Sequence, residues 1–164
     1  MKLYHYTSIE NLRAILSDNE IKTCPSNLLR PVAPKLINGT LTDETDSYKP
    51  VVWFTSLLDF DSAANYLGLA GSATDKTEAA IEIETALRPF CKWETWALKN
   101  GIDQEWFKAL KKTASGWTDF YVIETPVRIT EDCRIIFRPD IAEELMEGAG
   151  HGSSSDSKPQ GRRR

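Results

Sequence analysis

Short strand-like runs and amphipathic helical patterns follow one another in this chain without a regular alternation, and this order most constrains its fold. Doubly wound folds alternate strands and helices, whereas here two helices and then two strands come in succession. The order therefore predicts an α+β fold. The strand patterns cover residues 2–6, 20–24, 51–55, 78–84, 119–124 and 132–137, and the helical patterns cover residues 9–18, 59–69, 93–99, 103–112 and 141–146.

The length and the composition predict one globular domain with a polar end. A chain of 164 residues buries about 70% of its unfolded surface when it folds as one domain. We place this domain at residues 1–147, followed by a disordered polar and basic tail at residues 148–164, where Gly, Ser and charged residues dominate. No stretch is apolar enough to cross a bilayer, and no signal peptide is visible. We expect a soluble, cytoplasmic monomer with no membrane partner.

Cysteines and charge exclude some functions. Cys24, Cys91 and Cys133 lie far apart and form no Cys/His cluster, so we expect reduced thiols and no metal site. The net charge of −4 has the wrong sign for a protein that holds nucleic acid through its phosphates, although a small nucleic-acid footprint stays open. Neither GxGxxG nor GxxxxGK[ST] occurs, so a Rossmann or P-loop turn holds no dinucleotide here.

The first segment with chemical potential runs from Tyr4 to Ser8. Thr7 and Glu10 have the spacing of a capping box, which predicts that Thr7 caps a helix and that Glu10 reaches back. His5 would then lie near the backbone donors of a helix N-terminus, where a ribose or a phosphate could bind. The alternative is a partly buried, hydrogen-bonded histidine without a ligand.

Two further segments offer an aromatic sandwich and an acid. The strand at residues 51–55 and the pattern that ends at Tyr66 could hold a flat ring between Trp53 and Tyr66, or these could be core aromatics. The strand at residues 119–124 has an acid at each end, Asp119 and Glu124. A carboxylate there could stabilise an oxocarbenium-like ribose, as in glycosidases, or it could be a solvated acid.

In this order the segments resemble the ADP-ribosyltransferases. His5-Tyr6-Thr7 and the helical run that follows are similar to the His-Gly-Ser or His-Tyr-Thr start of poly(ADP-ribose) polymerases and DarT-type DNA-modifying toxins. Trp53-Phe54-Thr55 resembles the Tyr-Phe-Ala strand of the polymerase branch, and residues 62–66, Ser-Ala-Ala-Asn-Tyr, resemble its Ser-Lys-Ser-Ala-Asn-Tyr helix. Residues 119–123 are similar to its Glu-Tyr-Ile-Val-Tyr strand. The resemblance implies a split mixed β-sheet core with flanking helices.

The resemblance also implies roles for individual residues around a bound NAD, which would be a substrate. His5 would bind the adenosine ribose, Trp53 and Tyr66 would flank the nicotinamide, and Asp119 would be the catalytic acid. Arg30, in the long loop from Pro25 to Pro50 that suggests a lid or binding loop, is the expected pyrophosphate contact. The implied catalytic residues are Asp119, His5 and Trp53, and the implied NAD contacts are His5, Tyr6, Thr7, Arg30, Trp53, Phe54, Thr55, Ser62 and Tyr66.

Two departures from the family pattern bear on activity. Position 53 is Trp where the polymerases have Tyr, and position 119 is Asp where they have Glu. Aspartate has a shorter reach, and a misplacement of about 1 Å can cost roughly a hundredfold in rate. Glu124 is a second candidate acid, on the opposite strand face from Asp119.

The leading hypothesis is a mono-ADP-ribosyltransferase, a glycosyltransferase that moves ADP-ribose from NAD to DNA, RNA or protein, as a toxin or phage effector. A binding module for NAD, ADP-ribose or another nucleotide, with the same fold but impaired catalysis, is the main alternative. An RNA phosphate-transfer enzyme ranks last, because outside the tail His5 is the only histidine. A structural protein would be indicated if His5, Trp53 and Tyr66 shared no cleft.

Overall fold

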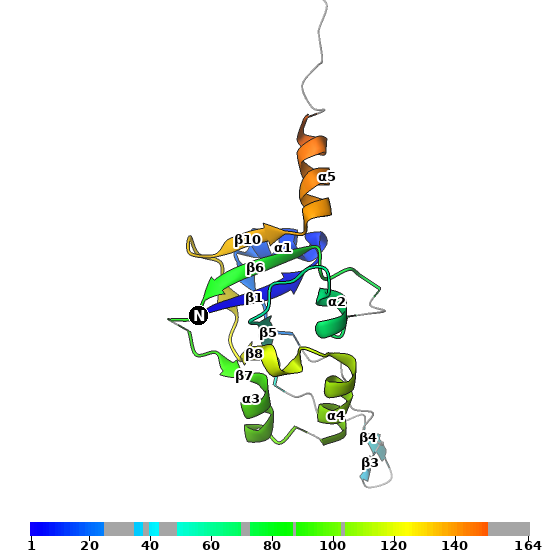
Figure 1. The fold of residues 1–164 in the computed structure, drawn as a ribbon. Coiled ribbons are helices and arrows are strands. Elements are labelled where there is room, and N and C mark those ends of the chain that lie inside the picture. The colour runs from blue at the N-terminus through cyan, green and yellow to red at the C-terminus, as the bar shows by residue number, and fades with distance from the viewer. Residues whose placement is uncertain are drawn as a thin grey trace, which may run out of the picture.

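The computed structural model describes residues 1–24, 35–37, 40–42, 49–69, 73–86, 88–102 and 104–150, which form an α+β fold as predicted (Figure 1). The helices are α1 (Ile9–Asp18), α2 (Ala63–Tyr66), α3 (Trp93–Lys99), α4 (Gln104–Thr113) and α5 (Pro139–Gly150), with a 3₁₀ helix η1 (Trp117–Asp119). The strands are β1 (Lys2–Thr7), β2 (Glu20–Ile21), β3 (Lys35–Ile37), β4 (Thr40–Thr42), β5 (Val52–Thr55), β6 (Ala79–Glu84), β7 (Cys91–Lys92), β8 (Phe120–Ile123), β9 (Val127–Arg128) and β10 (Arg134–Phe137).

Six strands form one sheet in the order β10-β6-β1-β5-β8-β7. β1 lies near its middle, with Tyr4 opposite Glu82 of β6 on one side and opposite Thr55 of β5 on the other. β5 pairs with β8 along its length, so that Thr55 lies opposite Phe120. Every strand pair in the described residues is antiparallel. The prediction of a mixed sheet is therefore wrong for this part of the chain, because neighbouring strands run in opposite directions.

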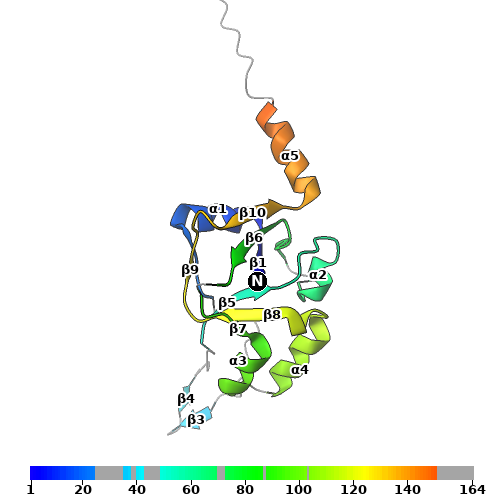
Figure 2. The ribbon, with the colours of Figure 1, turned by 60° about the vertical axis from the view of Figure 1, so that its left-hand side comes forward.

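One face of this sheet packs against α1 and a second, two-stranded sheet of β2 and β9. Side chains two residues apart on a strand share a face, so Leu3 and His5 of β1 both point to this side of the sheet. Ile81 of β6 lies opposite His5. Leu12 of α1 packs into the same buried cluster, as do Ile21 of β2 and Val127 of β9. Figures 1 and 2 both draw α1 beside β10, with β9 at the margin of the sheet in Figure 2.

The opposite face is covered by α2 at one end and by α3 and α4 at the other (Figure 1). Ala63 and Tyr66 of α2 pack on Tyr6 of β1 and Ala80 of β6. α3 and α4 pack on β5 and β8 through a core in which all five tryptophans of the chain take part. These are Trp93, Trp96 and Trp106, which are buried, and Trp53 and Trp117, which are half-buried against them.

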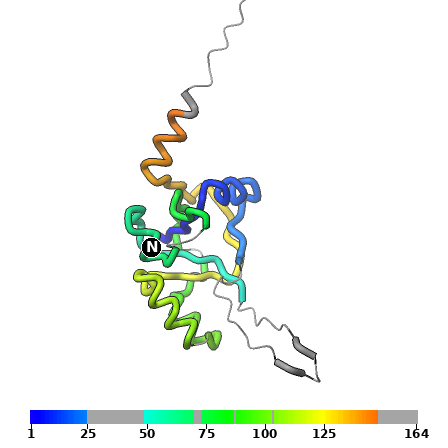
Figure 3. Tube along the Cα trace, turned by 90° about the vertical axis from the view of Figure 1, so that its right-hand side faces the viewer, coloured from blue at the N-terminus to red at the C-terminus, as the bar shows by residue number. Residues whose placement is uncertain are grey.

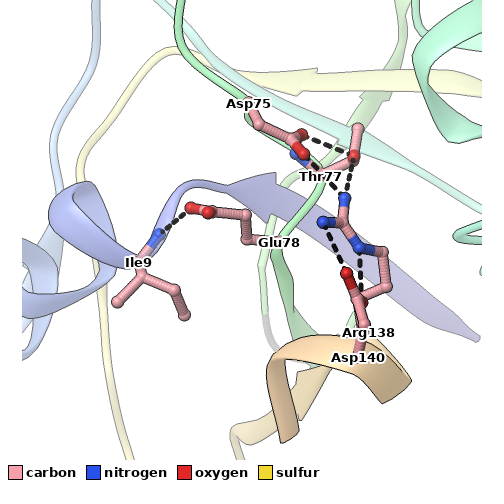
Figure 4. Close-up of polar contacts among 6 residues, drawn as sticks. All are labelled: Ile9, Asp75, Thr77, Glu78, Arg138 and Asp140. Atoms are coloured by element: carbon pink, nitrogen blue, oxygen red, sulfur yellow. Dashed lines mark hydrogen bonds and ion pairs between the residues drawn. The ribbon is translucent and has the colours of Figure 1, made fainter. Parts of the chain in front are cut away.

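The start of α1 differs from the predicted capping box. Ser8 is the N-cap, and its Oγ accepts a hydrogen bond of 3.2 Å from the N–H of Asn11. The N–H of Ile9 donates to Oε2 of Glu78, at 2.7 Å, from the loop before β6 (Figure 4). The prediction that Thr7 caps the helix is wrong, because β1 extends through Thr7 and buries its side chain.

The C-terminal helix α5 leaves the body at the end of β10 and extends away from it in every view (Figure 3). It runs from Pro139 to Gly150, and so is longer at both ends than the helical pattern at residues 141–146. The rest of the predicted tail, from His151 onward, lies outside the described residues. Among the described helices, none is long and apolar enough to span a membrane.

Candidate functional site

A hollow of about 310 Å³ opens between the loop after β5, helix α2 and the segment that joins α4 to β8. Its volume lies at the lower end of the range of roughly 300–1,000 Å³ for small-molecule sites. It has two acidic side chains, two serines, two leucines and one aromatic side chain, so it offers both polar and apolar contacts to a ligand. Its lining residues are Leu57, Leu58, Asp59, Ser62, Tyr66, Ser115, Gly116 and Asp119.

Asp119 lies at the rim of this hollow and is held by two hydroxyl groups. It ends η1 directly before β8, and its half-exposed carboxylate accepts hydrogen bonds from Ser56 Oγ at 3.1 Å and from Thr118 Oγ1 at 3.2 Å. The backbone N–H of Ser56 donates to the carbonyl of Asp119 at 3.1 Å, which continues the β5–β8 pairing by one residue. A carboxylate accepts about four hydrogen bonds, so Asp119 can still contact a ligand.

A pair of buried tyrosines forms the floor behind the hollow. The hydroxyl of Tyr66 donates to Oη of Tyr6 at 2.7 Å, and the same Oη accepts the N–H of Asp59 at 2.9 Å. Burial, together with the hydrogen bond to Tyr6, raises the pKa of Tyr66 well above its ordinary value of 10. Burial also raises the pKa of Tyr6. Both phenols therefore stay neutral near pH 7 and fix the loop that carries Leu57 and Asp59.

Asp59 organises the entry to α2. Its Oδ1 accepts the N–H groups of Asp61 and Ser62 at 3.0 and 3.3 Å, and its Oδ2 accepts the hydroxyl of Ser62. The hydroxyl of Ser62, the largest cause, lowers the pKa of Asp59, so this carboxylate is ionised at neutral pH. The Ser62 oxygen keeps its lone pairs for a donor in the hollow.

His5 lies on the other face of the sheet from Tyr6 and Tyr66. Its ring packs against Phe54, with the ring centroids 5.6 Å apart, and Nδ1 is 2.9 Å from the carbonyl oxygen of Trp53. A carbonyl only accepts, so Nδ1 carries the proton. Burial lowers the pKa of His5, although the bond to Trp53 opposes this effect. His5 is thus a neutral, structural link between β1 and β5 and does not line the hollow.

The remaining aromatic candidates also lie in the core. The Trp53 ring is 4.9 Å from that of Trp93 and 5.9 Å from that of Phe120, inside the tryptophan cluster. Phe54 is buried on the face of His5, and Thr55 is buried with its Oγ1 accepting the N–H of Leu57 at 3.2 Å. The structure therefore brings Ser62, Tyr66 and Asp119 together, with Tyr6 behind them, and separates His5, Thr7, Trp53, Phe54 and Thr55 from them.

The other two predicted positions have different outcomes. Arg30 and most of the loop from Pro25 to Pro50 lie outside the described residues. Glu124 follows β8 at the end away from Asp119, where it accepts hydrogen bonds from Trp96 Nε1 at 2.9 Å and Lys49 Nζ at 3.4 Å. The Trp96 indole, the largest cause, lowers the pKa of Glu124. Glu124 is therefore a partner of α3 and not a residue of the hollow.

Sequence reasoning missed Ser56 and Asp59. The spacing of Asp59 and Ser62 is that of an acid whose carboxylate accepts from the next backbone N–H groups, which is a local signal for a turn before a helix. Ser56 has no comparable signal, because its contact with Asp119 depends on the pairing of two strands far apart in the sequence.

No family model, curated protein or solved structure matches this chain. Within the described residues, no three or more His, Cys, Asp or Glu side chains are grouped so that they could hold a metal ion.

Proposed function

We propose that the chain is a mono-ADP-ribosyltransferase that uses NAD as its substrate and Asp119 as its catalytic acid. One observation carries this proposal: the three segments that resemble the family lie on neighbouring strands, β1, β5 and β8. Asp119, before β8, and Ser62 and Tyr66, in the segment after β5, line one hollow. The contact of β2–β9 with one face of the main sheet also fits the split sheet of that family.

The proposed chemistry breaks the bond between nicotinamide and its ribose. The electron pair of this bond goes to the ring nitrogen, and neutral nicotinamide leaves. The ribose carbon becomes positively charged, and the carboxylate of Asp119 stabilises this charge. An oxygen or nitrogen of a DNA, RNA or protein acceptor then attacks the carbon and loses its proton to Asp119 or to water.

The hollow suits the nicotinamide end of NAD. Tyr66 lines the hollow, and Ser62 offers an oxygen for the carboxamide N–H. The volume of the hollow lies at the lower end of the usual range and is too small for a whole dinucleotide. The adenosine half would therefore extend beyond it. The acidic side chains Asp59 and Asp119 suit the positively charged nicotinamide ring better than an anionic group.

A second candidate is a module that binds NAD or another nucleotide without turnover. The positions of His5 and Trp53 favour it, because neither reaches the hollow. Glu78 occupies the N-terminus of α1, so a phosphate of the nucleotide would have to bind elsewhere. A structural protein without a ligand was expected to separate His5, Trp53 and Tyr66 in the same way. The experiment must therefore test NAD binding as well as turnover.

The test is incubation of isotope-labelled NAD and cell extract with the wild-type chain and with Asp119→Ala. Glu124→Ala is the matched control, since it removes the acid at the other end of β8. Transfer of label by the wild type and by Glu124→Ala, but not by Asp119→Ala, would support the transferase. Equal loss in both variants would contradict the role of Asp119.

Binding separates the other candidates. If no label is transferred but calorimetry detects NAD binding that Tyr66→Ala weakens, the chain is the binding module. If the folded wild-type chain binds no NAD, both proposals fail and the structural protein remains.

A further inference from the structure

Helix α5 projects from the body of the described chain. Its ties to the body lie at its first turn, where Arg138 donates to Asp140 at 2.7 and 3.0 Å and to Asp75 at 2.7 Å (Figure 4). Arg138 Nη1 also donates to Thr77 Oγ1 at 3.1 Å. The turns that follow extend away from the sheet in all three overall views. The direction of the helix is therefore fixed at its base, and its later turns face outward.

The side chains of α5 divide into an apolar stripe and an acidic face. Ile141 and Leu145, and likewise Ala142 and Met146, are four residues apart, so these four residues share one side of the helix. Leu145 is 42% exposed and Met146 is 76% exposed. The acids occupy the rest of the helix surface, with Glu143 and Glu144 bordering the stripe, and α5 has no basic residue; they are Asp140, Glu143, Glu144 and Glu147.

A helix of this kind is poorly stable without a contact for its apolar stripe. Isolated helices shorter than about 12–15 residues are marginal in water, and α5 has 12. Among the described residues, Leu145 and Met146 belong to none of the buried clusters and stay exposed, so the stripe is open to an apolar surface of another molecule.

The charge of α5 selects the kind of surface. Helices that lie on membranes carry Lys and Arg on their polar face, which anionic lipid attracts, whereas the polar face of α5 would be repelled. A second copy of α5 would set one acidic helix against another, in a chain whose net charge is −4. An apolar groove whose rim carries Lys or Arg would pair with the stripe and the acids at once.

We propose that α5 is a docking helix that inserts Leu145 and Met146 into an apolar groove, rimmed by Lys and Arg, on a partner protein. The hydrogen bonds of Arg138 hold the helix in position before the partner arrives, which lowers the entropy cost of binding. This inference does not depend on NAD, so it can fail or hold independently of the proposed function.

The probe is a designed helical hairpin with two leucine-lined helices that form an apolar groove bordered by lysines. A second hairpin with glutamates in place of the lysines is its control. Calorimetry with the full chain should detect binding of the lysine hairpin, weakening as salt is added, and about tenfold weaker binding of the glutamate hairpin. Equal binding of the two hairpins would overturn the proposal.

Matched variants locate the contact on the chain. Leu145→Ser combined with Met146→Ser should weaken binding of the lysine hairpin about tenfold or more. Leu98→Ser changes a leucine on α3 that is 68% exposed and should leave binding unchanged. Equal weakening by both would overturn the proposal.

Sedimentation velocity and vesicle flotation test the other occupants. The chain alone should remain monomeric and should not float with phosphatidylcholine vesicles. A dimer that Leu145→Ser with Met146→Ser dissociates would assign the stripe to a second copy, and flotation that the same variant abolishes would assign it to a membrane. Either result would overturn the proposal.

Discussion

Ser56 and Asp119 face each other one residue beyond the β5–β8 pairing, with Ser56 Oγ donating to Asp119 Oδ1 at 3.1 Å. The backbone bond from Ser56 N–H to the Asp119 carbonyl fixes the same two residues. A side chain held by both its own hydrogen bond and its backbone has little freedom to rotate. Ser56 is therefore a positioning residue for the acid of the proposed transferase.

Replacing Ser56 with Ala should lower kcat for NAD turnover about tenfold and leave KM nearly unchanged, because the acid is less well oriented while the hollow keeps its shape. Ser56→Thr keeps the hydroxyl and should restore most of the rate. Ser17→Ala, which changes an exposed serine of α1, is the control. A rise in KM alone would place Ser56 in substrate binding instead.

The two buried tyrosine hydroxyls should contribute unequally to stability. Tyr6→Phe leaves the Asp59 N–H without its acceptor, while the Tyr66 hydroxyl can still donate to the Leu57 carbonyl at 3.2 Å, so we expect it to lower the free energy of unfolding by about 2 kcal/mol. Tyr66→Phe removes only one donor and should cost about 1 kcal/mol. Urea unfolding measures both, with the half-buried Tyr121→Phe as a control expected to stay within about 0.5 kcal/mol. Equal losses of unfolding free energy in Tyr6→Phe and Tyr66→Phe would contradict the assignment of Tyr6 as the acceptor of this pair.

Gly116 gives a way to alter the hollow without changing its polar groups. A Cβ at this position would lie 2.9 Å from Cδ2 and 3.1 Å from the carbonyl oxygen of Tyr66. Gly116→Ala should therefore displace Tyr66, cost about 1–3 kcal/mol and weaken ligand binding.

Gly101→Ala is the comparison for Gly116→Ala. Gly101 has φ of +65° and nothing within 4 Å of an added Cβ. This variant should cost about 1–2 kcal/mol through backbone strain alone and leave ligand binding unchanged. If Gly116→Ala does not weaken ligand binding, the position of Tyr66 is unimportant to the site.

Much of the fold could be predicted from the sequence, because its longer elements have clear periods. α3 has the predicted bounds, and α4 differs from its pattern by one residue at each end. β3, β4, β7 and β9 were missed, since two or three residues are too few to show an alternation. α2 begins later than its pattern because Asp59 holds the residues before it in a turn.

The candidate site was harder to predict, because it depends on strand register. Alternation tells which residues of one strand share a face, but not which face a neighbouring strand presents. Tyr4 lies opposite Thr55, which puts His5 on the face of Phe54 and leaves Trp53 on the other. A shift of one residue would have placed His5 and Trp53 together, and the sequence alone could not exclude it. Asp119, Ser62 and Tyr66 meet because they flank strands instead of lying within them.

The observed helix cap makes a prediction that separates it from the capping box. Ser8→Ala should lower the free energy of unfolding by about 1 kcal/mol, because the N–H of Asn11 loses its acceptor. Glu10→Ala should change it by less than about 0.5 kcal/mol, since Glu10 is exposed. Thermal unfolding of both variants checks this, and a larger loss for Glu10 would favour the capping box.

The ion pair between Arg138 and Asp75 at the base of α5 should make the free energy of unfolding depend on pH in the acidic range. Burial raises the pKa of Asp75, but hydrogen bonds from Arg138 and Thr77 outweigh this effect and lower that pKa from 3.8 to about 2. A carboxyl group with a lowered pKa in the folded state stabilises the fold above its unfolded pKa, and this contribution is lost as the pH falls towards 2.

Asp75→Asn should therefore flatten the loss of stability between about pH 4 and pH 2. The difference at pH 7 should be less than about 1 kcal/mol, because the Asp75 side chain is 46% exposed and solvent screens its pairing with Arg138. Urea unfolding at a series of pH values measures this, and Asp18→Asn, which changes an exposed acid paired with Lys22, is the control. If Asp75→Asn and the wild type lost stability in parallel over this range, the Arg138 contact would not hold the base of α5, and the docking helix would lack its fixed direction.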